Sequence, residues 1–438
     1  MKRIRRMQLV LIILLLATVV APALTWAGGL YLSEVAPAEV GLASAGVAAR
    51  AQDASTLFTN PAGMTRLQQP EVLFGLQPIY VHLDFDSDSK TSDSNQFRPN
   101  GKKAADGDAS GWLPSGSTFF VYPVNKDLRV GIGVLGYFGA ALSYDDHWVG
   151  RYYAKDVSLQ GLTIMPSVAY KVNEWLSVGA GLNAMYAMMD VKVAVNNNPL
   201  GIEHFKDGQL EVDDDEWGFG GLFGVLVEPS KGTRFGLTYM TSTELDFNAG
   251  AEFSGLKPAL KTILGNNGLL NLDLDIPIEA PQSVMLSGYH ELNDQWAIMG
   301  NLGWQDWSEF GSLDIGVSGP TSKNLTVDLN YKDTWHVAAG VQYKVSEPLL
   351  LSLGMAYDSS MMDDEERSPA LPLGEAWRFG TGAQYKVKKN MDVSLAYEFL
   401  WTGDMELDVN GGPLKGRVSG DYTNTSSQFI NLALNWRF

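Results

Sequence analysis

The chain has 438 residues, of which 32 are Lys or Arg, 50 are Asp or Glu and none is Cys. Its formal net charge of −18 argues against nucleic acid as a partner, because nucleic-acid-binding proteins present clustered cations to the phosphates. Without cysteine there is no disulfide framework, so an exported chain of this kind depends on hydrogen bonds and packing.

The first 27 residues have the three parts of a signal peptide. Four basic side chains stand within residues 2–6, an apolar run covers residues 7–24, and Thr25-Trp-Ala27 supplies a small-residue cleavage site. We expect cleavage after Ala27, although the apolar run also has about the minimum length of a retained membrane helix. No later apolar run is long enough for a membrane-spanning helix, but strands of a membrane barrel need no such run.

Residues 28–69 do not follow the strand pattern of the rest of the chain. Residues 41–51 are small and favour a helix, and Asp53 is placed to cap a second short helical turn. Pro61 ends that turn, because the residue before a proline is pushed out of the helical region. A compact, apolar segment of this kind predicts a plug, or hatch, inside a barrel, whereas a disordered tail is usually richer in charge.

From residue 70 to residue 438, apolar and polar side chains alternate with a period of two, which predicts strands with one apolar face. The pattern is clearest at the C-terminus, where one parity holds Ile430, Leu432, Leu434, Trp436 and Phe438. Aromatic residues recur at strand ends, as in the girdles of outer-membrane barrels, and several strands reach about twenty residues. These features favour a membrane barrel over a soluble sandwich.

Short turns and longer polar links alternate along this region, as expected for tight periplasmic turns and longer extracellular loops. About six short turns and seven long links would join about 14 strands. The predicted fold is all-β: a transmembrane antiparallel β-barrel of about 14 strands plugged by a small N-terminal helical hatch. The predicted domains are a signal peptide (1–27), the hatch (28–69) and the barrel (70–438).

The hatch region contains Gly41-Leu-Ala-Ser-Ala-Gly46 followed by Gln52-Asp-Ala-Ser-Thr-Leu-Phe-Thr-Asn-Pro-Ala-Gly-Met64. It closely resembles the N-terminal hatch of the FadL/TodX (OmpP1) family, outer-membrane transporters of long-chain fatty acids and other hydrophobic compounds. The resemblance continues in Gly136-Tyr-Phe-Gly139, in Tyr331-Lys-Asp-Thr-Trp335 and in the terminal Phe438. It implies a fourteen-stranded, plugged barrel that captures cargo in an extracellular groove and releases it laterally through a kink in the third strand.

The resemblance also assigns a gate and an exit. The hatch element beside the exit would be Asn60, Pro61 and Ala62. The kink in the third strand would be formed by Tyr137, Phe138 and Gly139. Glycine inside a strand commonly marks a bulge or a bend, although it also serves ordinary barrel packing.

Lys332 matches the lysine of the family's Lys-Asp-x-aromatic motif and has the inward parity of His336, which implies that it meets the carboxylate of a cargo. A lysine near a strand end is also commonly a rim charge. Fatty-acid members of the family place a second basic residue near the extracellular end of the fifth strand. This chain has Val191 and Val193 at inward parity there, which weakens fatty acid relative to uncharged hydrocarbon as the cargo.

Two of the long links are too apolar for solvated loops. The link near residues 196–208 carries Leu200, Ile202 and Phe205, and the link near residues 249–274 carries Phe253, Leu256, Leu260, Ile263 and Leu264. We expect these residues to line an extracellular landing groove, with residues 258–264 as a short amphipathic helix. The alternative is that they pack the loops against one another.

The five histidines are scattered and complete no catalytic motif, and the acidic runs lack calcium-loop spacing, so we expect neither an enzyme nor a metal or cofactor site. The predicted function is uptake of hydrophobic molecules, above all long-chain fatty acids. Uptake of neutral aromatic or aliphatic hydrocarbons by the same route is one alternative, and a general porin is another. The expected setting is the outer membrane of a Gram-negative bacterium, where the chain is a monomer that contacts membrane lipid and lipopolysaccharide. The expected partner in its assembly is the barrel-assembly machinery, which would recognise the strand ending in Phe438.

Overall fold

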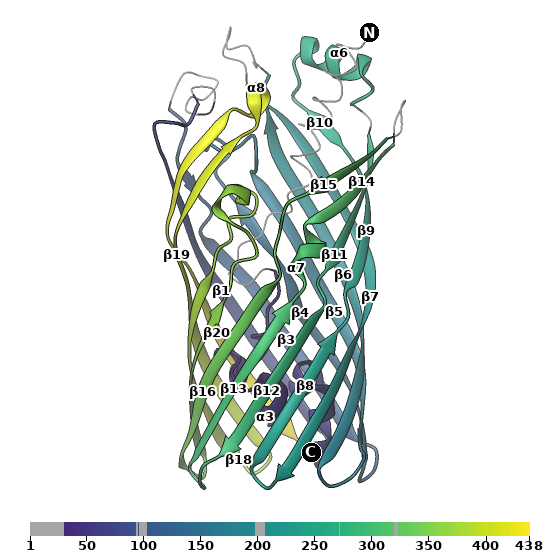
Figure 1. Ribbon diagram of the computed structural model, residues 1–438, viewed down its shortest axis with the longest axis vertical. Helices are drawn as coiled ribbons and strands as arrows, with labels where there is room; N and C mark the ends of the chain where they lie inside the picture. Colours follow the sequence, from purple (N-terminus) through teal and green to yellow (C-terminus); the bar gives the residue numbers. More distant parts are fainter. Residues whose placement is uncertain (1–29, 93–94, 96–102, 198–205, 271, 319–322) are drawn as a thin grey trace.

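The computed structural model describes residues 30–92, 95, 103–197, 206–270, 272–318 and 323–438 (Figure 1). The expected signal peptide and the expected groove residues Leu200, Ile202 and Phe205 lie outside the described residues.

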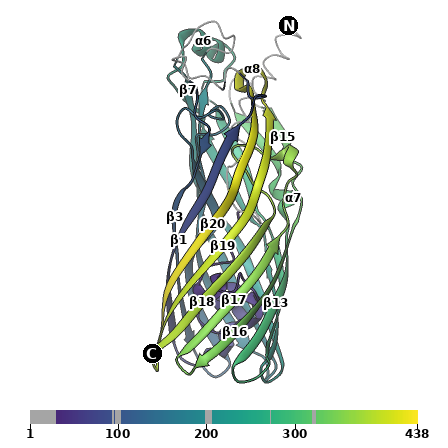
Figure 2. The same cartoon turned by 90° about the vertical axis from the view of Figure 1, so that its left-hand side faces the viewer.

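Among the residues that the structure describes, fourteen antiparallel strands close into a barrel, and this confirms the predicted fold. Each strand pairs with the next, and the last pairs with the first from Glu71↔Arg437 to Ser87↔Gly420 (Figure 2). In order around the wall the strands are β1 (Glu71–Ser87), β3 (Gly111–Pro123), β4 (Leu128–Ser143), β5 (Asp156–Lys171), β6 (Leu176–Val195), β7 (Gly208–Ser230), β8 (Thr233–Met240), β12 (Ser283–Glu291), β13 (Trp296–Gln305), β16 (Thr334–Ser346), β17 (Leu349–Asp358), β18 (Ala376–Lys388), β19 (Met391–Asn410) and β20 (Arg417–Arg437).

No described helix is both long enough and apolar enough to cross a membrane.

The period-two alternation separates the two faces of the wall. On β20 the side chains of Asn431 and Asn435 are buried in the lumen, whereas Leu432 and Trp436 are exposed on the outside. On each of three strands, two outward-facing aromatic residues stand eight positions apart, and together they form two belts: Trp296 and Trp304 on β13, Tyr343 and Trp335 on β16, and Tyr385 and Trp377 on β18. Eight strand residues span roughly 26 Å along the strand. With the strand tilt of about 35–45° usual in outer-membrane barrels, this corresponds to roughly 20 Å across the membrane, which fits within their apolar band of about 25 Å.

Four neighbouring wall strands are interrupted at one level and continue in a separate four-stranded sheet above it (Figure 1). The upper strands are β9 (Thr243–Gly250), β11 (Asp273–Ala280), β14 (Ser312–Ser318) and β15 (Lys323–Asp328). The helix α7 (Trp307–Phe310) fills the interruption between β13 and β14, and its Trp307 and Phe310 are fully buried. The remaining outer elements are β2 (Gly107–Asp108), β10 (Glu252–Ser254), α6 (Pro258–Asn266), η2 (Asp364–Glu366) and α8 (Gly412–Lys415).

The hatch helices lie in the lumen of the lower barrel, and they appear in purple in Figure 1. They are α2 (Pro37–Val40), α3 (Val47–Arg50), α4 (Thr56–Thr59) and the 3₁₀ helix η1 (Pro61–Arg66). Ser55 is the N-cap residue of α4, and Asp53, the expected cap, accepts a hydrogen bond from the Ser55 amide (3.0 Å).

The backbone of the hatch packs directly on the backbone of the wall. A Cβ at Gly236 would lie 1.9 Å from the Ala48 carbonyl oxygen, and one at Gly354 would lie 1.9 Å from that of Leu42. Only glycine permits approaches this close. Glu39 and Arg50 form a buried ion pair inside the hatch, and burial raises the pKa of the Glu39 carboxyl to about 7. The plug therefore fits the lumen without intervening side chains at these points.

Candidate transport route

The third barrel strand, β4, carries a β-bulge at the position where the family resemblance implies a kink. Gly136 pairs with Leu162 and Phe138 with Gly161, so Tyr137 is the extra residue of a β-bulge. Gly139 has φ +116°, and a Cβ there would lie 2.1 Å from the Leu159 carbonyl oxygen. Glycine is therefore required at this position by both conformation and space.

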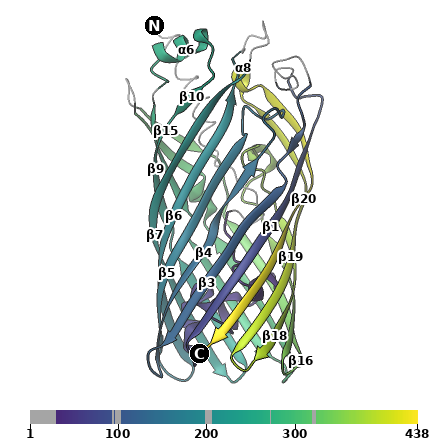
Figure 3. The same ribbon diagram turned by 180° about the vertical axis from the view of Figure 1, so that it is seen from behind.

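The ladder between β3 and β4 stops at the kink. It runs from Pro123↔Arg129 to Ser117↔Leu135, and beyond this point β3 pairs with β1 and β4 with β5 (Figure 3). The wall therefore has two strand edges that are not paired with each other on this side of the barrel.

Residues 30–32 occupy the edge of β4 at that point. The Leu32 amide donates to the Tyr137 carbonyl (2.7 Å), and the Gly139 amide donates to the Leu30 carbonyl (2.8 Å). Tyr31 forms an isolated antiparallel bridge with Phe138. The N-terminal segment thus replaces β3 as the hydrogen-bonding neighbour of β4.

An aromatic cluster joins this segment to the hatch. The Tyr31 ring lies 5.2 Å from the Tyr137 ring, and the Phe58 ring lies 5.0 Å from it, measured between centroids. Burial raises the pKa of the Tyr31 hydroxyl, so this group stays neutral. The cluster connects α4 to the kink through contacts between side chains.

Asn60 fastens three elements together. Its side-chain amide donates to the carbonyls of Ala48 (2.7 Å) and Val225 (3.0 Å), and its oxygen accepts from the Ala62 amide (3.0 Å). A Cβ at Gly179 on β6 would lie 2.4 Å from the Ala62 nitrogen. The structure therefore places the Asn60-Pro61-Ala62 tripeptide against β6 and β7, while Tyr31 and Phe58 contact the kink.

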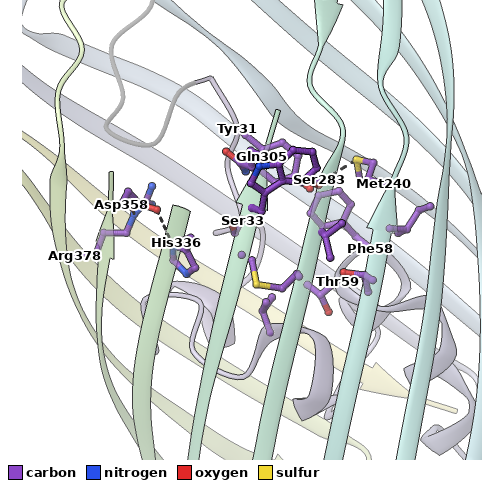
Figure 4. Close-up of a pocket in the computed structure, with 17 residues that line it drawn as sticks. Tyr31, Ser33, Phe58, Thr59, Met240, Ser283, Gln305, His336, Asp358 and Arg378 are labelled. Carbon is purple, nitrogen blue, oxygen red and sulfur yellow. Dashed lines mark hydrogen bonds and ion pairs between the residues drawn. The ribbon is translucent and has the colours of Figure 1, made fainter. Parts of the chain in front are cut away.

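A small cavity of about 50 Å³ lies above the hatch, lined by Tyr31, Phe58, Met240, His336 and Arg378 among others (Figure 4). One side of it is polar. Arg378 binds Asp358, Glu34 (2.9 Å) and Glu398 (3.4 Å), and His336 Nδ1 lies 2.7 Å from Asp358 Oδ1. Glu34 also accepts a hydrogen bond from Ser44 (2.8 Å). This buried cluster ties the N-terminal segment to strands β16–β19.

The outer end of the barrel carries α6, which confirms the expected amphipathic helix (Figure 1). Leu264 is buried in the loop core, and Phe253, Leu256 and Leu260 pack partly buried against it, as the packing alternative expects. Ile263 is 49% exposed. An apolar surface therefore remains on this helix above the lumen.

A family model described as "Outer membrane protein transport protein (OMPP1/FadL/TodX)" matches residues 18–438. The chain belongs to this family. As a FadL/TodX protein it is an outer-membrane transporter of hydrophobic molecules in a Gram-negative bacterium, and its family consists of transport channels rather than enzymes.

Relatives of this FadL/TodX chain match it over most of their length. A long-chain fatty acid transport protein of Escherichia coli O6:H1 is 29% identical over 79% of this chain and 81% of the relative. Outer membrane protein P1 of Haemophilus influenzae is 28% identical, with 85% and 86% covered. Among solved structures, a Pseudomonas aeruginosa FadL homologue superposes with TM-score 0.85 at 20% identity, covering 94% of this chain and all (100%) of that one. The Pseudomonas putida toluene transporter TodX gives TM-score 0.66 at 16% identity, with 94% and 100% covered. The solved structures support the fold.

The structure places Lys332 of this FadL/TodX barrel in an exposed link and not on the inner face of a strand. It lies in the link between β15 and β16, its side chain is 56% exposed, and its ammonium forms an ion pair with Asp363. That hydrogen bond raises the pKa of Lys332. The expected inward orientation does not extend from His336 to Lys332, because the strand begins only at Thr334.

Sequence reasoning singled out neither Arg378 nor its three acidic partners as site residues. Their inward parity on β17, β18 and β19 is a usable signal, since a charge on the inner face of a barrel needs a partner. Glu34 gives no such signal, because it lies in a segment without periodicity.

Proposed function

We propose that this FadL/TodX protein takes up long-chain fatty acids and releases them laterally through the gap between β3 and β4. The observation that carries the route is the edge of β4 beyond the kink, where residues 30–32 stand in place of β3. Relatives named long-chain fatty acid transport proteins, which match over most of the chain, support the cargo.

Capture begins at the outer end. The exposed Ile263 and the neighbouring Phe253, Leu256 and Leu260 offer an apolar surface, to which Leu200, Ile202 and Phe205 would contribute, with Leu264 packed beneath. Leaving one methylene in water costs about 0.8 kcal/mol, so a long acyl chain favours a continuous apolar path over a water-filled pore. Lys332 would bind the carboxylate of the cargo in place of the Asp363 carboxylate, at the level where the upper four-stranded sheet begins.

Release requires that the N-terminal segment leave the β4 edge. In this mechanism the hatch helices α2 to η1, which we call the body of the hatch, stay in place while residues 30–32 move. Asn60, Pro61 and Ala62 hold this body against β6 and β7. The bulge at Tyr137, Phe138 and Gly139 keeps β4 from pairing with β3. Once residues 30–32 move away, the gap faces the membrane and the cargo leaves sideways.

Neutral hydrocarbon is the second candidate cargo. Val191 and Val193 are buried on the inner face of β6, where fatty-acid members are expected to carry a basic residue, and this favours an uncharged molecule. A general porin is disfavoured, because the hatch backbone packs directly on the wall.

We also propose the remaining features of the chain as expected from its sequence. The leader (1–27) is removed, and residues 28–69 and 70–438 act as hatch and barrel in a monomer. The barrel-assembly machinery would recognise the last strand, whose Phe438 is exposed beside Trp436. Acidic residues at the outer rim would share divalent ions with lipopolysaccharide. N-terminal sequencing and the native mass of the purified protein test the first two points.

Uptake measured in cells that lack their own fatty-acid transporter tests the proposal. Cells expressing this chain should import radiolabelled oleate with saturation, faster than they import toluene, and the purified protein should conduct few ions in a planar bilayer. Saturable import of toluene without oleate would establish the hydrocarbon alternative, and steady ion conductance would establish the porin.

A further inference from the structure

The outer face of the barrel wall contains a hollow of about 850 Å³, within the range of roughly 300–1,000 Å³ typical of ligand sites. Its floor is made of small outward-facing residues that are direct neighbours across three strands: Gly288 pairs with Gly300, and Gly300 pairs with Ala339. The missing side chains at these positions create the depression.

Large apolar side chains form the sides of the hollow. They come from β8, β13, β16, β17 and β18, and they are Phe235, Ile298, Val341, Leu353, Met355 and Phe379. Leu353 is 61% exposed and Phe235 is 51% exposed, so these side chains stand away from the wall. The hollow is thus a groove with apolar sides and a backbone floor.

The groove lies at the depth of the membrane hydrocarbon. Gly300 stands between Trp296 and Trp304 of the two aromatic belts on β13, and Ala339 stands between Trp335 and Tyr343 on β16. Water and polar groups are excluded from this zone, so the groove must be filled by hydrocarbon. The groove is therefore continuous with the surface by which the barrel contacts lipid.

The groove is distinct from the proposed exit. The strands β8, β12, β13 and β16 lie across the front of Figure 1, whereas β3 and β4 face the viewer in Figure 3. Along the strand order, the centre of the groove lies half the circumference away from the gap between β3 and β4. Cargo that leaves by the kink does not enter the membrane on this side.

The periplasmic end of the groove is polar. Thr233 begins β8, His290 is next to the last residue of β12, and the Thr233 hydroxyl lies 2.9 Å from His290 Nδ1. Both residues line the hollow. A hydroxyl and an imidazole at the membrane surface are suitable donors for a phosphate group.

We propose that this groove binds one phospholipid of the periplasmic leaflet, with an acyl chain on the Gly288–Gly300–Ala339 floor and its phosphate at Thr233 and His290. The polar end favours a phospholipid over a second copy of the chain, because a barrel wall at this depth would bring no anionic group to it.

Filling the groove tests this proposal. Ala339→Phe places a ring on the floor at a position that already faces lipid, and Gly288→Leu does so independently, since a Cβ at Gly288 would meet only the Phe235 ring at 3.6 Å. Ala180→Phe on β6 is the matched control, because Ala180 also faces outward but lies far from the groove. His290→Ala removes the polar end without filling the floor.

Each protein would be reconstituted in vesicles of phosphatidylethanolamine and phosphatidylglycerol containing some oleate, extracted in mild detergent and weighed by native mass spectrometry. We expect wild type and Ala180→Phe to retain one phospholipid. Ala339→Phe and Gly288→Leu should retain about fivefold less, because a larger side chain in a packed apolar site excludes its occupant. His290→Ala should also lower retention. Unchanged gel mobility on heating and unchanged oleate uptake would show that the variants fold.

Three results overturn the proposal. Equal phospholipid retention by wild type and Ala339→Phe means that the groove holds no specific lipid. Loss of bound oleate, rather than phospholipid, in Ala339→Phe assigns the groove to cargo. A wild-type dimer that Ala339→Phe converts to monomer assigns it to a second copy. None of these results bears on whether cargo exits at the kink, so the two proposals fail separately.

Discussion

The amide of Gly139 donates a 2.8 Å hydrogen bond to the carbonyl of Leu30, so the start of the hatch serves as a short strand for the kinked edge of β4. The kinked edge of β4 and residues 30–32 are therefore joined directly by backbone hydrogen bonds. The pairing of β4 with β3 ends beside the bulge, and residues 30–32 hydrogen-bond to Tyr137 and Gly139 there instead.

Replacing Gly139 by alanine should abolish most lateral transport. The backbone conformation of Gly139, with φ +116°, costs an L-residue about 1–3 kcal/mol, and the new Cβ would meet the Leu159 carbonyl oxygen at 2.1 Å. The strand can relieve the backbone strain and the steric clash by losing the bulge. Then β4 would pair further with β3, and the gap between these two strands would narrow. We expect oleate uptake to fall about tenfold, in line with roughly 1.4 kcal/mol.

Gly136→Ala is the matched control for that prediction, because a Cβ at Gly136 would lie 3.7 Å from its nearest neighbour, the Gly161 carbonyl. It should transport as wild type does. If both variants transport normally at equal surface levels, the kink is not on the route.

A disulfide between residue 31 and residue 138 should block uptake reversibly. Tyr31 and Phe138 form an antiparallel bridge, in which Cα atoms lie about 4.5–5.5 Å apart, within the span of a disulfide. The chain has no cysteine of its own, so Tyr31→Cys with Phe138→Cys gives one defined link. Uptake should be lost after oxidation and recover on reduction.

A second cysteine pair separates movement of the segment from movement of the whole hatch. The Ala48 amide donates to the Ser287 hydroxyl (3.0 Å), so Ala48→Cys with Ser287→Cys fixes the body of the hatch to β12. We expect this pair to transport when oxidised, since only residues 30–32 need to move. Loss of uptake in both pairs would show that the entire hatch moves.

Much of this arrangement is predictable from local patterns in the sequence. Alternation predicts the strands, and Pro258 with the leucines after it predicts α6. The position of the kink at Gly136 and Gly139 came from the family resemblance, because glycine also serves ordinary barrel packing. Each of these signals depends on neighbours in the chain, and backbone geometry translates them directly into structure.

The contacts between distant segments are not predictable in this way. The sequence does not predict the hydrogen bond between Leu30 and Gly139. It joins two backbone groups, and the same groups of any other residues could form it. The ion cluster joins Glu34 to Arg378, which lie more than 300 positions apart, and its composition depends on which strands become neighbours. The role of Lys332 as a carboxylate contact comes from a sequence motif. Strand alternation does not predict its orientation, because Lys332 lies in an irregular link before the strand begins.

Removing the buried cation of that cluster should destabilise the barrel strongly. Arg378→Met removes the cation that Asp358, Glu34 and Glu398 share in the lumen, and breaking a buried ion pair from one side typically costs about 3–5 kcal/mol. Guanidinium unfolding in detergent should show a lower midpoint. Lys332→Met is the control, because its ion pair is exposed to water, and it should unfold as wild type does.

Lys332→Ala should weaken fatty-acid capture without affecting neutral cargo. The half-saturating oleate concentration should rise severalfold while toluene uptake stays constant, because only oleate presents a carboxylate to the ammonium. Asp363→Asn, which frees the lysine from its present partner, should lower the half-saturating concentration. Unchanged oleate kinetics in both variants would remove Lys332 from the route.

Glu39 should make the wild-type hatch less stable as pH rises from about 4.5 to about 7. Burial raises the pKa of its carboxyl from 4.5 to about 7 in the folded chain. Below pH 4.5 both the folded and the unfolded states hold the proton, so the group does not affect stability. Between the two values the unfolded chain releases its proton and the folded chain keeps it, so stability falls as pH rises. Above pH 7 the penalty is complete.

Glu39→Gln removes this titration and keeps a hydrogen-bonding partner for Arg50. Its melting temperature should match that of wild type near pH 4.5 and exceed it by a few degrees, in order of magnitude, at pH 8. Thermal unfolding of the two proteins across this range, followed by circular dichroism, measures the difference. Parallel curves would mean that Glu39 has an ordinary pKa, and that its pairing with Arg50 fully offsets the cost of burying the carboxylate in the hatch.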